Sequence, residues 1–260
     1  MDESLDHSPE PADFYTGVVA EMYRHLRSET FDAEPYARFI ARWGQPALEL
    51  GCGDGDPILD LVARGLHVEG LDSSADMLER CRVAADERGV DVVLHLATFQ
   101  SMDLGRRYRS IYLAGATFNL LPDDAAAEAA LERIAAHLEP EGAALVSLFV
   151  PQTTDAADVG SVREHLMPDG ALMRLTVLDA ERDEAERTQT TTLRYELIDG
   201  DRHTTADRSW ILHWIEQEAF ATMAERAGLS VRGVYADGGT PATSHDTAFT
   251  FVLQPAGQHT

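Results

Sequence analysis

The sequence contains no lysine and only two cysteines. All 21 basic residues are therefore arginines, and they stand against 45 acidic residues, which gives a formal net charge of -24 at pH 7. A surface this acidic repels polyanions, so we expect no nucleic-acid partner. Beyond that exclusion, the acidity is equally typical of a surface adapted for solubility or for a salty cytoplasm.

The two cysteines, Cys52 and Cys81, are too few for a disulfide framework, and both lie in apolar stretches, so we expect reduced thiols. No apolar window approaches the roughly 20 residues that a membrane span requires. The N-terminal stretch also lacks the basic and then apolar pattern of a secretion signal. We therefore expect a soluble, cytoplasmic protein without a membrane partner.

A chain of 260 residues, 44% of them hydrophobic, is long enough for one α/β domain with an appended lobe. Composition and periodicity divide it into five expected ranges. These are a disordered acidic tail (1–13), an N-terminal helical cap (14–44), a Rossmann-like core (45–150), an antiparallel β flap over the substrate pocket (151–214), and a return helix with two final core strands (215–260).

Short apolar runs alternate with helical patterns along the core, which is typical of a doubly wound parallel sheet. The expected strands are 47–50, 67–71, 92–96, 111–113 and 143–150, followed after the flap by 229–235 and 247–253, seven in total. The flap itself is expected to contain strands at 172–177, 189–198 and 208–214. The fold class is therefore α/β, with the flap inserted after the fifth strand.

The strongest motif is ALELGCGDGD at 47–56, an apolar strand that leads into a glycine-rich turn before a helix near Pro57. Such a turn lets the backbone approach a ligand closely. Glu49, Asp54 and Asp56 would repel a pyrophosphate, and Asp56 occupies the position of the last glycine in a dinucleotide fingerprint. The residues therefore favour S-adenosylmethionine, which has a sulfonium, an ammonium and no phosphate, over the alternative, NAD.

A second motif, VEGLDSS at 68–74, ends the next expected strand on Asp72. An acidic residue about 20 positions after the glycine turn accepts hydrogen bonds from ribose hydroxyls in nucleotide-binding folds. The alternative is that Asp72 only caps the following helix.

These residues resemble a known family. The run LELGCGDG at 48–55 resembles motif I of the class I, Rossmann-like S-adenosylmethionine-dependent methyltransferases, and GLDSSADML at 70–78 resembles their second motif. The resemblance extends from Tyr23 to Leu253 and is greatest to bacterial small-molecule N-methyltransferases of natural-product biosynthesis, which act on amino sugars and lincosamide antibiotics. It implies a mostly parallel sheet with an antiparallel last strand, and S-adenosylhomocysteine as the product.

The resemblance also implies roles for individual residues. Glu49 would lie near the methionine ammonium, Asp72 would hold the ribose, and Met77 would flank the adenine. Thr98 stands where the family usually has an acid for the adenine amino group, and its hydroxyl can accept that hydrogen bond or share it with Gln100. The other residues expected at the cofactor are Tyr15, Tyr23, Gly51, Cys52, Gly53, Ser73, Phe99 and Ala114.

Tyr15 and Tyr23 lie on one face of the first expected helix, where they close over the site or simply pack on the core. Phe118 and Asn119 follow the fourth strand and are expected to face the acceptor. Arg208 and Trp210 are expected there too, although Arg208 is equally typical of a structural ion pair. We find no cluster of metal-binding acids and expect no metal.

Methyl transfer from a sulfonium needs alignment more than a base, but an acceptor amine must be neutral to attack. His213 in the flap is the first candidate base, although it is also typical of a histidine at a helix entrance. The other candidates are His165, His203 and the pair His245 and Asp246. We expect N-methylation of a small molecule. The alternatives are an O-methyltransferase and a cofactor-binding protein without turnover, and a homo-oligomer through the cap or flap is left open.

Overall fold

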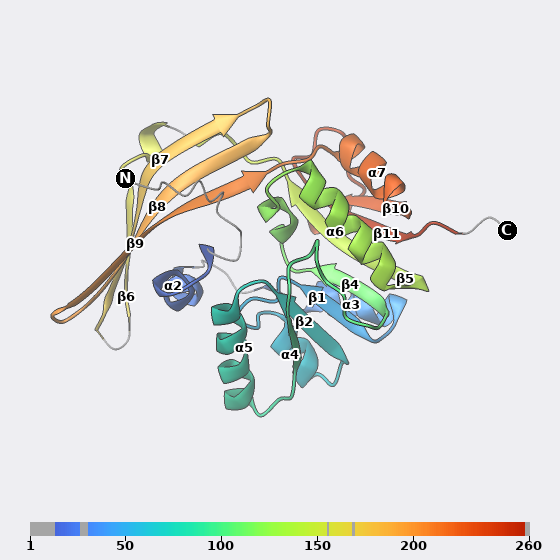
Figure 1. Ribbon diagram of the computed structural model, residues 1–260, viewed down its shortest axis with the longest axis horizontal. Helices are drawn as coiled ribbons and strands as arrows, with labels where there is room; N and C mark the ends of the chain where they lie inside the picture. Colours follow the sequence, from blue (N-terminus) through green and yellow to red (C-terminus); the bar gives the residue numbers. More distant parts are fainter. Residues whose placement is uncertain (1–13, 27–30, 155, 168–169, 258–260) are drawn as a thin grey trace, which may run out of the picture.

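The computed structural model describes residues 14–26, 31–154, 156–167 and 170–257, so the acidic tail expected at 1–13 lies outside the described residues. A seven-stranded sheet forms the core (Figure 1), in the order β10-β11-β5-β4-β1-β2-β3. Its strands are β1 (Ala47–Leu50), β2 (Val68–Asp72), β3 (Val93–Leu96), β4 (Tyr108–Leu113), β5 (Leu138–Phe149), β10 (Leu229–Ala236) and β11 (Ala248–Pro255).

Strands β1 to β5 pair in parallel, whereas β11 is antiparallel to both of its neighbours. The predicted doubly wound sheet with an antiparallel last strand is confirmed. Two strands begin earlier than expected, β4 at Tyr108 and β5 at Leu138. Both first residues are fully buried, but polar residues interrupt the apolar pattern that follows them, so the sequence placed the expected starts too late.

Helices cover both faces of this sheet. They are α2 (Val18–Leu26), α3 (Glu34–Trp43), α4 (Ile58–Ala63), α5 (Ala75–Arg88), α6 (Asp124–His137) and α7 (Gln217–Arg226). Alternation along β1 divides the core: Leu48 and Leu50 pack with α6 and α7, whereas Ala47 packs with α3, α4 and α5. None of the helices among the described residues has the length and apolar character needed to cross a membrane.

The flap is a separate four-stranded antiparallel sheet, in the order β6-β7-β8-β9. Its strands are β6 (Val162–Leu166), β7 (Leu172–Asp183), β8 (Thr188–Asp199) and β9 (Arg202–His213). Figure 1 shows it standing away from the core, with α2 beneath it. The three expected strands are present, and β6 is an addition that the sequence analysis missed because this short edge strand is exposed at every position and carries no apolar alternation.

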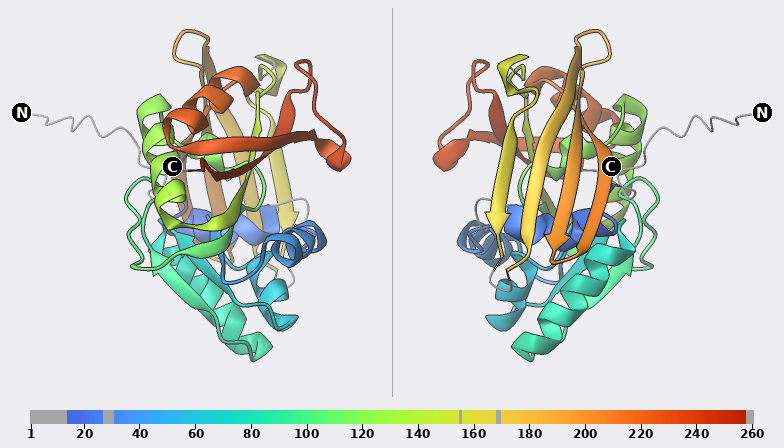
Figure 2. Two further views of the ribbon diagram at one scale, coloured as in Figure 1. Left: turned by 90° about the vertical axis from the view of Figure 1, so that its right-hand side faces the viewer. Right: turned by 90° about the vertical axis from the view of Figure 1, so that its left-hand side faces the viewer.

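The predicted helical cap is shared between two sheets. Val18, Val19 and Met22 of α2 pack against flap residues such as Met173 and Tyr195. Helix α3 instead packs on the core beside β4 and β5. Figure 2 shows α2 lying across the strands of the flap. Helix α2 therefore fills the space between the flap and the core.

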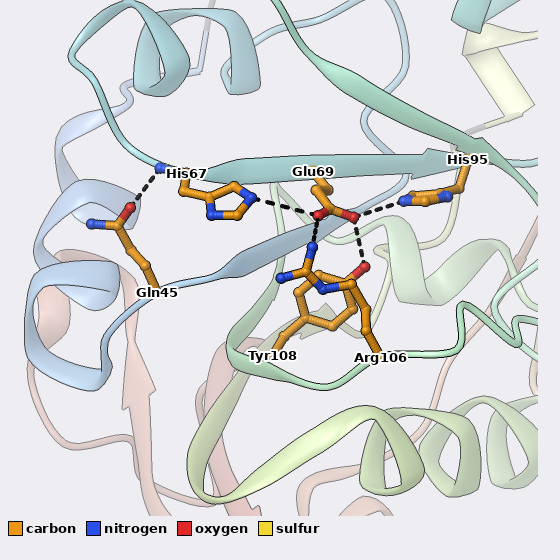
Figure 3. Close-up of polar contacts among 6 residues, drawn as sticks. All are labelled: Gln45, His67, Glu69, His95, Arg106 and Tyr108. Atoms are coloured by element: carbon orange, nitrogen blue, oxygen red, sulfur yellow. Dashed lines mark hydrogen bonds and ion pairs between the residues drawn. The ribbon is translucent and has the colours of Figure 1, made fainter.

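A polar network around Glu69 fastens the start of β2 (Figure 3). The Glu69 carboxylate, almost fully buried, accepts hydrogen bonds from Tyr108 Oη and from His95 Nε2, both at 2.8 Å, and from Arg106. Burial alone would raise the pKa of Glu69, but the hydrogen bonds from His95 and Tyr108 and the charge of Arg106 lower it below its ordinary value. This network therefore lies near the amino-terminal end of β2, opposite the carboxyl end that carries Asp72.

Candidate functional site

The glycine-rich turn after β1 brings backbone to the carboxyl end of the sheet. Gly51 and Gly53 have φ angles of 72° and 53°, a conformation that favours glycine. The amides of Gly51 and Cys52 donate to the Leu71 carbonyl at 2.7 and 3.1 Å, which fixes the turn against β2. A Cβ atom on Gly51 would lie only 2.8 Å from Thr117 Cγ2, so the space beside this glycine admits no side chain.

Asp72 ends β2 directly beside this turn. Its Oδ2 accepts from the Gly53 amide at 2.9 Å and its Oδ1 from the Ser74 amide at 2.8 Å. Burial raises the pKa of Asp72, although these backbone N–H groups stabilise the carboxylate. The two hydrogen bonds fix the carboxylate at the carboxyl edge of the sheet, where doubly wound folds bind ligands.

A cavity opens at this edge, and we call it the cofactor cavity. It is lined by Tyr15, Gly51, Asp72, Ser73, Thr98, Phe99, Gln100, Thr117, Leu120 and Leu121. The structure therefore brings together seven of the residues that the sequence analysis expected at the cofactor. It adds Thr117, Leu120 and Leu121, which lie on the 3₁₀ helix η1 (Thr117–Leu120) and just after it. A spacing of three residues places Thr117 and Leu120 on one face of such a helix, a signal available in the sequence.

Glu49 lies behind the glycine turn and is fully buried. Its Oε2 accepts from Tyr112 Oη at 2.6 Å, whereas its Oε1 has no hydrogen-bond partner among the described residues. Burial raises the pKa of Glu49 to about 8, against the opposing effect of the Tyr112 hydrogen bond. A buried carboxyl oxygen without a donor fits a ligand that carries an ammonium group, because a bound cation supplies the missing donors.

The remaining residues expected at the cofactor lie near the cavity but do not line it. Cys52, Met77 and Ala114 are buried. Met77 packs close to Gly53, where an added Cβ atom would come within 3.3 Å of Met77 Cε. Tyr23 packs edge-on against Tyr15, with ring centroids 5.4 Å apart.

A second cavity, which we call the acceptor cavity, lies between α2 and the flap. It has a volume of 290 Å³ and is lined by Phe14, Tyr15, Val19, Tyr23, Arg163, Leu175, Leu193, Tyr195 and Trp210. Tyr15 lines both cavities and is their shared wall. Its backbone carbonyl accepts from Ser74 Oγ at 2.6 Å, and the next glycine, Gly17, donates to Asp76 at 2.7 Å. These contacts hold Tyr15 beside the helix that follows Asp72.

Two residues expected at the acceptor have their side chains elsewhere. Phe118 is buried in the core and packs edge-on against Phe220 at 5.5 Å. Asn119 is also buried, and its amide binds the backbone of β5 and β9. Neither side chain lines the cofactor cavity or the acceptor cavity, because η1 turns Thr117 and Leu120 toward the cofactor cavity instead.

His213 lies at the base of the flap, 3% exposed, with its Nε2 3.4 Å from Asp124 Oδ1 at the start of α6. Burial lowers its pKa, and the charge of Asp124 opposes that change. His165, His203 and His245 also line neither cavity. Among the described residues, no group of histidine, cysteine and acidic side chains is arranged to hold a metal ion.

A doubly wound sheet, a glycine turn that excludes side chains, and an acidic residue that ends β2 define the class of folds that bind a nucleoside-containing cofactor at the sheet edge. Residues 47–142 match the family model described as a methyltransferase domain. The chain is also 30% identical over 223 residues to a cypemycin N-terminal methyltransferase from a Streptomyces species, a match that covers 81% of this chain and 83% of that protein. The chain belongs to the class I S-adenosylmethionine-dependent methyltransferases.

A second relative is the dTDP-3-amino-3,6-dideoxy-alpha-D-glucopyranose N,N-dimethyltransferase of Streptomyces fradiae, 32% identical over 140 residues. That match covers 51% of this chain, and the chain spans about half of the relative, 53%. Among solved structures, the CcbJ methyltransferase of Streptomyces caelestis shares the fold, with a TM-score of 0.74 at 22% identity over 95% of this chain and 98% of that one.

Proposed function

We propose that this chain methylates an amine nitrogen of a small-molecule acceptor, with S-adenosylmethionine as the donor. When bound, the cofactor supplies a methyl group on a positively charged sulfur. The nitrogen–methyl bond forms as the sulfur–methyl bond breaks, and the amine proton passes to solvent. The cofactor cavity would hold the donor through Asp72, Glu49 and the glycine turn, and the acceptor cavity would hold the amine.

The observation that carries the choice of nitrogen is the lining of the acceptor cavity. Among the described residues, no histidine and no carboxylate lines it. A neutral amine attacks with its own lone pair, whereas an alcohol needs a base to remove its proton. Burial also raises the pKa of Tyr15 far above its ordinary value, so its hydroxyl remains protonated at the shared wall.

The acceptor cavity is also lined by several aromatic side chains. Phe14, Tyr15, Tyr23, Tyr195 and Trp210 line it, so an acceptor bound there would be oriented by packing against their rings. In-line methyl transfer depends mainly on this alignment. The relatives named for sugar and peptide amines support an amine acceptor of natural-product type.

The test is a mass-shift assay on two matched acceptors, a nucleotide-linked 3-amino sugar and its 3-hydroxy counterpart. We expect a methylated product from the amine and none from the alcohol. Methylation of the alcohol alone would contradict the choice of nitrogen. Cofactor binding without product from any acceptor in a broad panel would favour the alternative of a binding protein without turnover. The cytoplasmic location and the absence of a nucleic-acid partner stay predictions.

A further inference from the structure

Two arginines of the flap form no ion pair with a carboxylate among the described residues. Arg163 lies on β6 and Arg208 on β9. In the described part of the chain, neither forms an ion pair with a carboxylate, although Arg208 donates to the Asp207 backbone carbonyl at 3.0 Å and its charge helps to lower the pKa of the Asp207 carboxyl. Other flap arginines do pair: Arg174 with Glu164 at 2.8 Å and Arg194 with Asp207 at 2.7 Å.

The register of the flap brings both arginines to Tyr195. Arg163 pairs with Leu175, which in turn pairs with Tyr195. Arg208 pairs with Leu193, two residues from Tyr195 along β8, and residues two apart on a strand share a face. Burial raises the pKa of Tyr195, and the positive charges of Arg163 and Arg208 oppose this rise.

This cluster of two guanidinium groups and one phenol lies at the acceptor cavity, which Arg163 and Tyr195 both line. Arg208 is half-buried. Arg163 is exposed, so the cost of desolvation falls on Arg208, whose half-buried charge forms no ion pair among the described residues. An anionic group in the cavity would offset that cost and accept hydrogen bonds from the planar guanidinium forks, whose geometry matches carboxylate and phosphoryl oxygens.

We propose that Arg163, Arg208 and Tyr195 form an anion subsite, which binds a phosphoryl or carboxylate group of the acceptor. The proposal deepens the proposed function, on which it rests for the amine, since the anionic group would anchor the acceptor at the flap while the amine faces Tyr15. The subsite itself requires no methyl transfer and is measured separately.

The experiment compares the wild-type protein with Arg163→Gln, Arg208→Gln and a matched control, Arg202→Gln. Arg202 is exposed at the start of β9 and lines neither cavity. Each protein, saturated with S-adenosylhomocysteine, is titrated calorimetrically with pyrophosphate as the phosphoryl probe and with succinate as the carboxylate probe. Thermal unfolding of all four proteins verifies that the variants are folded.

We expect one probe to bind the wild-type and Arg202→Gln proteins equally. Its Kd should rise about tenfold or more in each of the other two variants, because each variant removes one charge-assisted hydrogen bond to the probe. The probe that binds identifies the anionic group. Binding of neither probe to the wild-type protein, or equal binding to all four proteins, would overturn the subsite.

A parallel methylation assay separates this proposal from the proposed function. An amino sugar is offered with and without its nucleoside diphosphate, and we expect the two arginine variants to raise KM for the charged acceptor only, with kcat unchanged. Anion binding that depends on the arginines without methylation of any acceptor would remove the proposed function and leave the subsite. Methylation that is indifferent to both arginines would remove the subsite alone.

Discussion

The side-chain amide of Asn119 donates to the carbonyl oxygen of His213 at 2.9 Å. The same nitrogen donates to the Phe149 carbonyl at 2.9 Å, and Asn119 Oδ1 accepts from the Phe149 amide at 3.0 Å. Phe149 ends β5, where the chain leaves the core for the flap, and His213 ends β9, where it returns. One side chain therefore ties together both strands that connect the flap to the core.

Replacing Asn119 with Ala should lower the free energy of unfolding by about 3 kcal/mol, because buried backbone groups at both connections lose their partners. Urea denaturation measures the change. Asn119→Asp is the matched variant, since it retains the acceptor for the Phe149 amide but loses both donated hydrogen bonds. Its buried carboxylate would face two carbonyl oxygens, so its loss of stability should exceed that of Asn119→Ala. Unchanged stability with a large loss of methyl transfer would instead support the sequence-based prediction that Asn119 contacts the acceptor.

His213→Gln tests the predicted base. The side chain lies beside Asp124 and lines neither cavity, so we expect kcat within about threefold of the wild-type value and an unchanged pH–rate profile. A general base would contribute roughly 10² to 10⁴-fold, so a loss of that size would restore His213 to the catalytic role. Steady-state kinetics across the pH range decides between the two.

Gly51→Ala should lower the affinity for S-adenosylhomocysteine by about tenfold or more, because displacement of groups in a binding site by about 1 Å has effects of that order. The added Cβ atom would meet Thr117 Cγ2 at 2.8 Å in the lining of the cofactor cavity. Gly65→Ala is the control, since Gly65 also has a positive φ, 82°, but no atom lies within 4 Å of an added Cβ. Both variants should lose about 1–2 kcal/mol of stability from the backbone conformation, and equal affinities in calorimetric titration would contradict the account.

Glu49→Gln should alter the pH dependence of stability. The pKa of Glu49 is raised from 4.5 to about 8 in the folded protein, so above pH 4.5 the folded state binds more protons than the unfolded state. This contribution to stability is complete below pH 4.5 and is lost as the pH rises toward 8. Without cofactor, the variant should therefore match the wild type near pH 5 and exceed its stability at pH 8.

Thermal unfolding between pH 5 and pH 9 measures this difference. The exposed residue Glu87 provides the control variant, Glu87→Gln, which should follow the wild-type curve. Parallel curves for the wild type and Glu49→Gln at every pH would show that Glu49 carries no raised pKa.

The fold and the cofactor cavity were largely predictable because their signals are local. Apolar runs that end on glycine or aspartate, such as the one that ends on Asp72, report both a strand and the residue at its carboxyl edge. The residues around the acceptor were not predictable in this way, because the direction of their side chains depends on contacts between distant segments. Asn119 follows a strand as expected, yet its amide is directed to the backbone at Phe149 and His213, 30 and 94 residues away.

Strand β6 shows a second limit. Its five residues are all exposed, so no periodic pattern identified it, and Arg163 could not be placed in the acceptor cavity from the sequence. Arg208 was expected near the acceptor or in an ion pair, and among the described residues it forms no ion pair with a carboxylate. Only the pairing of β6 with β7, of β7 with β8 and of β8 with β9 brings these two arginines to the same tyrosine.

Calorimetric titration with S-adenosylhomocysteine, for the wild-type protein, Asp72→Ala and the control Asp60→Ala, measures whether Asp72 holds the cofactor. Asp60 lies on α4 in an exposed ion pair with Arg88, away from both cavities. We expect micromolar binding by the wild type and the control, and a loss of about tenfold or more in Asp72→Ala, since the carboxylate would accept hydrogen bonds from the ribose hydroxyls. No binding by the wild-type protein, or equal binding by all three, would contradict it.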